Sequence, residues 1–166
     1  MTTPTFATCD LCDAHEADTS GAFRVLPPVF RDFGATGRFS GQVATVRSLE
    51  DNSRIREAVA TPGDGRVLVV EGGGSLRCAL VGGNLAALAA KNGWAGIVVD
   101  GAVRDLAELT AAGIAVKALA LMPMRSVKRG EGQAGLPVVI QGVTVRPGDW
   151  LYADEDGIVV SDRPLT

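Results

Sequence analysis

Residues 82–108 read GGNLAALAAKNGWAGIVVDGAVRDLAE, and this stretch decides the fold. Strong helix formers follow the two glycines, so residues 84–91 predict a helix whose first amides are left open. The apolar run at 97–99 predicts a buried strand, and residues 103–111 predict the next helix. Helices and strands that alternate with short connections are typical of an α/β domain with a mainly parallel sheet.

Polar groups gather at the starts of these two predicted helices. The amides of residues 82–85 lie at a helix N-terminus, which carries roughly half a positive charge and therefore suits a carboxylate or a phosphate. Arg104 and Asp105 follow the predicted strand at 97–99, at the kind of junction where open α/β sheets bind ligands. An arginine that holds an anion, beside a carboxylate that holds a metal, suits an oxo-acid substrate.

The same residues permit a purely structural interpretation. Arg104 and Glu108 are four residues apart, so on a helix they can pair at the surface, which contributes about 0.3–0.5 kcal/mol. Asp105 in a first helical turn also interacts favourably with the helix dipole. The spacing alone therefore leaves a site and a surface pair equally open.

The remaining sequence extends the alternation and then changes character. Further predicted elements are strands at 42–47, 66–70 and 115–121 and a helix at 53–60 that is capped by Asn52 or Ser53. Four short strands follow, at 138–140, 143–145, 150–153 and 157–160. We therefore predict one domain over residues 1–166, of α/β class, whose mixed central sheet carries a packed antiparallel β unit.

Composition limits the classes of protein that fit. The 166 residues are 46% hydrophobic, enough for one domain that buries about 70% of its unfolded surface. No apolar run of about 18 residues and no N-terminal signal pattern appear, so we expect a cytoplasmic protein without a membrane span. The net charge of −3 offers no footprint for nucleic acid, so contact with RNA metabolism would run through another protein.

Two local motifs suggest chemistry that their context disfavours. Cys9 and Cys12 form a C-x-x-C pair, but no strand precedes it and only Cys78 and His15 remain as further zinc ligands. We expect instead a short helix capped by Thr8, and a surface or capping role for His15.

The glycine loop at 72–75 lacks both the dinucleotide fingerprint and a phosphate-binding lysine. A tight turn is the favoured interpretation, although such a loop can also line a pocket shared with the turn at 82–83.

A family resemblance favours the site. Gly83, followed after twenty residues by Arg104-Asp105-x-x-Glu108, resembles the motif shared by the regulator of ribonuclease activity A family and the class II 4-hydroxy-4-methyl-2-oxoglutarate aldolases. Similar blocks lie at 9–13 (CDLCD), 39–46 (FSGQVATV), 67–76 (VLVVEGGGSL), 101–105 (GAVRD) and 151–158 (LYADEDGI). Together they cover most of the chain.

The resemblance implies a swivelling β/β/α domain, a ring-shaped homotrimer with sites between subunits, and a divalent metal, Mg²⁺ or Mn²⁺. Arg104 would bind the pyruvyl oxygen, and Asp105 would hold the metal directly or through water. Glu108 would orient a metal-bound water or brace Arg104. The substrate carboxylate would bind the amides of Gly82, Gly83, Asn84 and Leu85.

The implied chemistry is cleavage of oxo-acids to pyruvate. Retro-aldol cleavage of 4-hydroxy-4-methyl-2-oxoglutarate and decarboxylation of oxaloacetate both generate pyruvate enolate, which a metal and a guanidinium stabilise. No lysine lies inside these motifs, which disfavours a Schiff base. The alternative is a non-catalytic regulator that binds and inhibits ribonuclease E. Regulators of the family can lack an aspartate after the arginine, whereas this chain has Asp105 there, which favours the enzyme.

Overall fold

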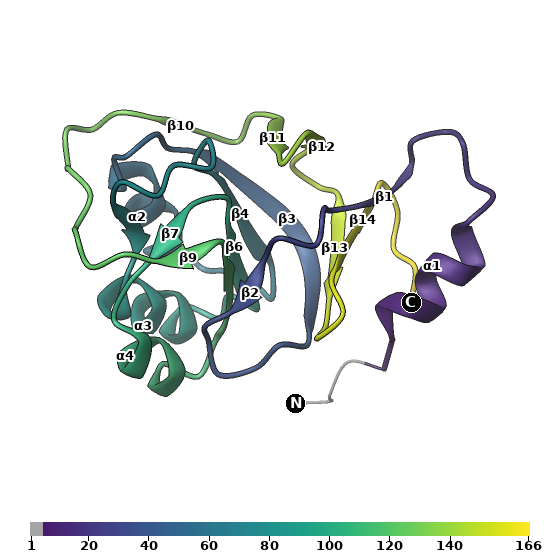
Figure 1. Cartoon of the computed structure of the whole chain (residues 1–166), viewed down its shortest axis with the longest axis horizontal. Coiled ribbons are helices and arrows are strands. Elements are labelled where there is room, and N and C mark those ends of the chain that lie inside the picture. The colour runs from purple at the N-terminus through teal and green to yellow at the C-terminus, as the bar shows by residue number, and fades with distance from the viewer. Residues whose placement is uncertain (1–4) are drawn as a thin grey trace.

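The computed structural model describes residues 5–166 and confirms the α/β class with a mixed central sheet of nine strands (Figure 1). These strands are β1 (Phe23–Val25), β2 (Arg31–Asp32), β3 (Phe39–Arg47), β4 (Val67–Glu71), β6 (Gly96–Val99), β8 (Ala115–Ala118), β10 (Gln133–Ala134), β13 (Trp150–Ala153) and β14 (Ile158–Ser161). Their order is β1-β14-β13-β3-β4-β6-β8-β2, and β10 pairs with the end of β3.

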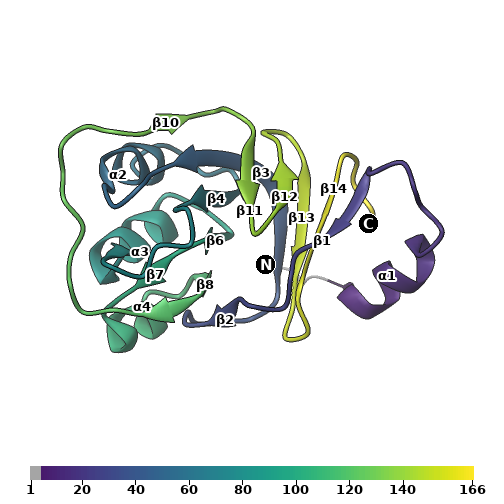
Figure 2. The ribbon, with the colours of Figure 1, turned by 45° about the horizontal axis from the view of Figure 1, so that its top comes forward.

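The centre of the sheet, from β3 through β4 and β6 to β8, is parallel. Its crossovers carry three helices, α2 (Ser53–Val59), α3 (Gly83–Lys91) and α4 (Leu106–Ala111). Figures 1 and 2 show these helices stacked on one side of the central strands. The predicted elements at 42–47, 53–60, 66–70, 84–91 and 97–99 are thus confirmed to within a few residues at their ends.

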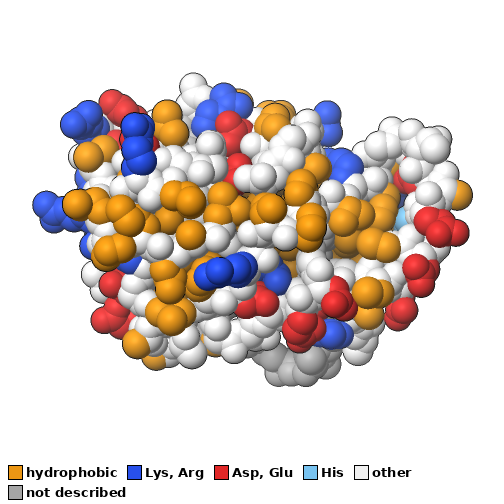
Figure 3. All heavy atoms as spheres, in the orientation of Figure 1, with side chains coloured by type: hydrophobic (Ala, Val, Ile, Leu, Met, Phe, Trp, Pro, Cys, Tyr) orange, Lys and Arg blue, Asp and Glu red, His pale blue; other side chains and the backbone are white. Residues whose placement is uncertain are grey.

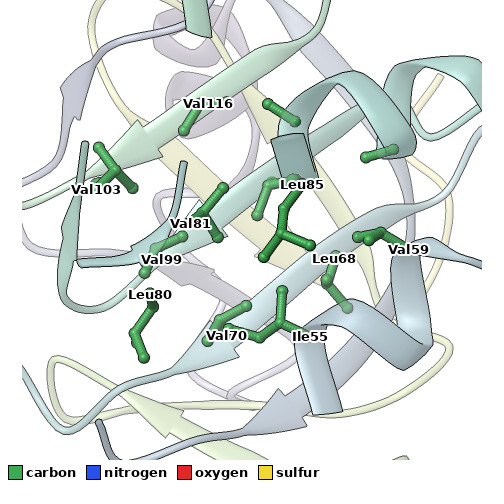
Figure 4. Packing of buried hydrophobic residues seen from close by; sticks show 14 of the residues in the cluster. Ile55, Val59, Leu68, Val70, Leu80, Val81, Leu85, Val99, Val103 and Val116 are labelled. Atoms are coloured by element: carbon green, nitrogen blue, oxygen red, sulfur yellow. The ribbon is translucent and has the colours of Figure 1, made fainter. Parts of the chain in front are cut away.

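Aliphatic side chains from both layers form the main core between the sheet and these helices (Figure 4). Ile55 of α2, Leu68 of β4 and Leu85 of α3 are all less than a tenth exposed. Burying each such side chain stabilises the fold by roughly 1.5–3 kcal/mol. The starts of α2 and α3 are therefore held firmly against the sheet.

A second, three-stranded parallel sheet lies within the crossovers and was not predicted. It contains β5 (Ala79–Val81), β7 (Ala102–Val103) and β9 (Ala120–Leu121), in that order. The strand predicted at 115–121 is wrong as one element, because Leu119 donates its amide to the Gly101 carbonyl and the chain passes from β8 into β9.

The helix predicted at 103–111 also begins later than expected. Val103 ends β7, and α4 begins only at Leu106. Asp105 between them has φ 65° and ψ 53°, a left-handed conformation that cannot continue a right-handed helix. Arg104 and Glu108 therefore do not share a helix, and the surface pair inferred from their spacing is wrong.

The C-terminal strands divide between two sheets. Strands β11 (Val138–Ile140) and β12 (Val143–Val145) form a hairpin of their own, with Gln141 and Gly142 both at positive φ as a type I′ turn requires. By contrast, β13 and β14 join the central sheet antiparallel beside β3. The predicted antiparallel β unit is therefore present as the β11–β12 hairpin, while the other two of its four predicted strands extend the central sheet.

Helix α1 (Thr8–His15) lies at the opposite end of the molecule from α2, α3 and α4 (Figure 1). Its apolar contacts are with β13 and β14, through Leu11, Tyr152 and Val159. The predicted cap is wrong: Ala7 holds the N-cap position, and the Thr8 hydroxyl instead donates to Asp154 Oδ1 at 2.6 Å. Across residues 5–166, every helix is too short or too polar to cross a bilayer.

Candidate active site

A cavity of about 130 Å³ lies where β5 and β7 end and α3 begins. It brings together five of the predicted site residues, which are Gly82, Asn84, Leu85, Arg104 and Asp105. The other two, Gly83 and Glu108, do not line it. The strand-to-helix junctions chosen from sequence therefore meet in space.

Pairing between β5 and β7 positions Arg104. The Arg104 amide donates to the Val81 carbonyl at 3.0 Å, so its half-buried side chain starts beside the turn that follows β5. A Cβ at Gly82 would lie 3.4 Å from Arg104 Cγ and 2.7 Å from Asp105 Oδ2. Glycine at position 82 thus lets the side chains of Arg104 and Asp105 approach the backbone of the turn.

Asp105 occupies part of the turn that was predicted to bind an anion. Its Oδ2 accepts a hydrogen bond from the Gly83 amide at 3.0 Å, so this amide is already used by a protein carboxylate. The next amides, those of Asn84 and Leu85, have no acceptor within residues 5–166, as expected for the first turn of a helix. The amides of the 84–85 half of the turn therefore remain available to a ligand.

Glu108 packs against the turn from outside the cavity. A Cβ at Gly83 would lie only 2.5 Å from Glu108 Cβ and 3.1 Å from Oε2. Gly83 is thus required for the close contact between α3 and α4. Within the described chain, Arg104 and Glu108 form no ion pair, and the Arg104 Nη1 group donates to the Pro123 carbonyl at 3.3 Å.

Sequence reasoning missed the other wall of the cavity. It is formed by Asn52 and Arg56 at the start of α2 and by Arg125, Ser126 and Lys128 from the segment after β9. A bridge between Ala79 of β5 and Arg125 brings this segment to the site. The two residues are far apart in sequence and no local pattern marks them, so no sequence signal was available.

Asp51 anchors the 125–131 segment to the start of α2. Its carboxylate is fully buried and accepts hydrogen bonds from the amides of Ser53 (2.8 Å), Arg129 (2.7 Å) and Glu131 (3.3 Å). Burial alone raises the pKa of this carboxyl, but these hydrogen bonds outweigh burial and lower the pKa to about 2. Asp51 therefore stays ionised, and its hydrogen bonds hold the 125–131 segment against the start of α2.

The cavity suits a hydrated divalent cation better than a fully coordinated one. Asp105 is its only carboxylate, and residues 5–166 hold no cluster of three or more His, Cys, Asp or Glu side chains arranged for a metal. Mg²⁺ commonly binds through one or two carboxylates and keeps several waters or substrate oxygens. Asp105, with Oδ2 on the turn and Oδ1 remaining, fits that mode of binding.

The glycine loop at 72–75 does not line this cavity. A Cβ at Gly72 would lie 2.6 Å from the Asp100 carbonyl oxygen, so the loop packs closely against the chain, as a tight turn does. The pocket shared with the turn at 82–83 is therefore not formed.

The N-terminal cysteines and histidine behave as structural groups. A hydrogen bond to Asp156 raises the pKa of Cys9, and burial raises that of Cys12, so neither thiol is activated. The His15 ring stacks on Phe23, and its Nδ1 donates to the Leu11 carbonyl at 2.8 Å.

Comparison with known proteins identifies relatives over the whole domain. Residues 8–160 match the family described as RraA-like: Aldolase/RraA. A protein of Albidiferax ferrireducens, provisionally named as a 4-hydroxy-4-methyl-2-oxoglutarate aldolase, is 63% identical over 96% of each chain. A Burkholderia mallei protein with the same provisional name is 59% identical over 96% of this chain and 98% of its own.

Solved structures agree with the sequence relatives. The RNA-processing inhibitor RraA of Thermus thermophilis superposes with a TM-score of 0.91 at 45% identity, covering 98% of this chain and 96% of that one. RraAS2 of Streptomyces coelicolor, an unusual member of the RNase ES inhibitor RraA family, gives a TM-score of 0.75 at 26% identity, covering 94% and 81%. The chain belongs to the RraA-like family, which includes both named aldolases and named RNA-processing inhibitors.

Proposed function

We propose that this protein is a divalent-metal-dependent carbon–carbon lyase that releases pyruvate from oxo-acids through an enolate. Its proposed reactions are decarboxylation of oxaloacetate and retro-aldol cleavage of 4-hydroxy-4-methyl-2-oxoglutarate. The observation that carries the proposal is the convergence of Arg104, Asp105 and the open amides of the turn in one cavity. The provisional names of the close relatives support it.

Binding begins with the carboxylate beside the 2-oxo group. The free amides of Asn84 and Leu85 point from a helix N-terminus and donate to this carboxylate, since such an end favours negative charge. Arg104 donates to the 2-oxo oxygen from the adjacent junction. These contacts hold the bond to be broken, C3–C4, in one orientation.

Bond cleavage then leaves an electron pair at C3. In oxaloacetate the C4 carboxylate departs as CO₂; in the hydroxy acid the 4-hydroxyl loses its proton and C4 becomes the carbonyl carbon of a second pyruvate. In both reactions the C2 oxygen becomes an enolate oxygen, and Arg104 donates to it more strongly as its charge grows. Protonation at C3 gives pyruvate. A Mg²⁺ or Mn²⁺ ion held by Asp105 would supply Lewis-acid polarisation of the 2-oxo group.

Lys128 lines the cavity, although no lysine lies inside the sequence motifs, so a Schiff-base mechanism has to be tested. A lysine near a carbonyl substrate can form a Schiff base, which borohydride reduces to a stable adduct. We expect no adduct at Lys128 when pyruvate and borohydride are added together, and we expect a chelator to stop pyruvate release. An adduct together with chelator-resistant turnover would contradict the enolate–metal mechanism.

A homotrimer is part of the proposal. Ten large hydrophobic side chains of the described chain are exposed, among them Leu121, Met124 and Val139. Figure 3 shows hydrophobic side chains in a band across the face where Figure 1 places β7, β9 and β13. Contiguous exposed apolar surface of this kind marks interaction sites. Light scattering should give three times the chain mass, and a monomer mass would refute the assembly.

The second candidate function is regulation of a ribonuclease, supported by the similarity to the RNA-processing inhibitor RraA of Thermus thermophilis. In this alternative the chain binds ribonuclease E as a protein partner and makes no direct contact with nucleic acid. A pure regulator should inhibit ribonuclease E without metal-dependent release of pyruvate. The lyase should release pyruvate whether or not it inhibits the ribonuclease.

A further inference from the structure

The cavity has two walls, and only one is used by the proposed chemistry. The turn at 82–85 and Arg104 bind the pyruvate half of the substrate. The opposite wall, from α2 and the 125–131 segment, contributes Arg56, Arg125 and Lys128. No reaction step assigned above uses these cations.

The second wall is rich in unpaired positive charge. The cavity is lined by four cationic side chains and by one carboxylate, that of Asp105, although the whole chain has a net charge of −3. None of the four cations forms an ion pair within residues 5–166. Cations concentrated in one concave site attract and hold anions.

A buried hydroxyl points to a ligand at the same place. Ser126 is 5% exposed and lines the cavity, yet its Oγ has no hydrogen-bond partner within the described chain. The Oδ1 atom of Asn52, on the same wall, is also without a partner there. Buried polar atoms are nearly always hydrogen-bonded, so an unpartnered hydroxyl that faces a cavity is suited to a bound polar group.

The two walls stand on opposite sides of β5. The Ala79 amide donates to the Met124 carbonyl on one side at 2.7 Å, and the Arg104 amide donates to the Val81 carbonyl on the other at 3.0 Å. Neighbouring strands are about 4.8 Å apart, so the backbones that carry Arg104 and Arg125 are separated by roughly two such spacings. Long arginine side chains from both can therefore reach the two ends of one short ligand.

We propose that Arg125 and Arg56, with the Ser126 hydroxyl, form a second anion subsite that binds the far (C5) carboxylate of a five-carbon dicarboxylic 2-oxo acid. The subsite selects diacids over monoacids of equal length. This inference rests on the proposed function for the placement of the pyruvate half, whereas selection between the two acids is a property of binding alone.

The test is therefore an equilibrium binding measurement that needs no turnover. Calorimetry with Mg²⁺ present compares 2-oxoglutarate with 2-oxopentanoate, which has the same chain length but no second carboxylate. Wild type should bind the diacid at least about tenfold more tightly, as expected for a charge-assisted contact. In Arg125→Gln the ratio of the affinity for 2-oxoglutarate to the affinity for 2-oxopentanoate should fall below about threefold, and Arg56→Gln should lower this ratio as well.

Arg129→Gln provides the matched control, because Arg129 lies on the same segment and does not line the cavity. It should keep the wild-type ratio. A wild-type ratio near one, an unchanged ratio in Arg125→Gln, or an equal loss in Arg129→Gln would each overturn the subsite. Failure of the lyase reaction with the ratio intact would refute the proposed function and leave the subsite standing.

Discussion

The charged groups around the buried Asp154 have partners within the described chain, whereas the four cations that line the cavity form no ion pair there. Lys117 is 2% exposed and binds Asp32 at 2.9 Å and the Asp154 carbonyl at 2.7 Å. Asp154 in turn accepts from both the amide and the hydroxyl of Thr8. Each of these charges has a protein partner.

The cavity is organised differently. Arg56, Arg104, Arg125 and Lys128 all line one small space without a carboxylate paired to any of them in the described chain. Like charges held together cost stability, and a ligand that supplies the missing anion recovers it. The comparison teaches that substitutions around Asp154 should affect stability, while those at the cavity should affect chemistry.

The largest expected effect on chemistry is that of Arg104→Lys. Lysine keeps the charge but loses the planar fork, so kcat for oxaloacetate should fall by about 10²–10³, as for loss of one preorganised donor. The thermal melting temperature should stay close to that of wild type. Arg129→Lys is the control. If kcat of Arg104→Lys stayed within a few-fold of wild type, Arg104 would contribute only its positive charge and no directed hydrogen bonds.

Asp154→Ala should show the opposite pattern. It leaves the amides of Thr8 and Asp156 without their acceptor, which should lower the free energy of unfolding by about 2–4 kcal/mol. The kcat of the folded fraction should not change. Urea unfolding paired with kinetics measures both, and a loss of kcat without a loss of stability would break the comparison.

Two adjacent glycines sharpen the contrast at the cavity itself. In Gly83→Ala the new Cβ meets Glu108 Cβ, so α3 and α4 must separate and stability should fall by about 1–3 kcal/mol. In Gly82→Ala the new Cβ meets the carboxylate of Asp105, which can rotate away, so turnover should fall with little change in stability. Equal effects of both variants on stability would contradict this division.

The smallest effect concerns acid sensitivity. The pKa of Asp51 is about 2 in the folded protein, below the ordinary value near 3.9 for an unfolded chain. Its contribution to stability is therefore complete above about pH 4 and is lost as the pH falls toward 2. The pKa of Asp154 is also lowered, because hydrogen bonds from Thr8 outweigh the effect of burial, so its contribution to stability is likewise lost as the pH falls through its folded-state pKa.

Asp51→Asn should make the fall in unfolding free energy between pH 4 and pH 2 shallower than in wild type, without abolishing it. Urea titrations at several pH values measure this slope. An unchanged slope would show that these hydrogen bonds do not lower the pKa of Asp51.

Much of this fold could be predicted from local sequence. The apolar run of β4 and the helix formers of α3 each specify their own element, because burial and helix propensity act within a few residues. The two junctions that carry the turn at 82–85 and Arg104 follow from the same reasoning. Their meeting in one cavity follows from adjacent parallel crossovers.

The rest depended on contacts between distant segments. Strands β5, β7 and β9 are two or three residues long, too short for a periodic pattern. The left-handed conformation of Asp105 shortened α4, and nothing in the sequence RDLAE signals it. Arg125 and Ser126 reach the site only because their segment pairs with Ala79 and is anchored on Asp51.

The central claim is that Asp105 supports metal-dependent release of pyruvate. The most direct measurement compares wild type with Asp105→Asn, in which the amide oxygen retains an acceptor for the Gly83 amide while the charge is removed. Pyruvate release from oxaloacetate is followed with Mg²⁺ and with a chelator, and the rate with Mg²⁺ alone is subtracted. The account predicts that wild type is active only with metal and that the folded variant falls to the background rate. Chelator-resistant activity in wild type, or a variant within a few-fold of it, would contradict the claim.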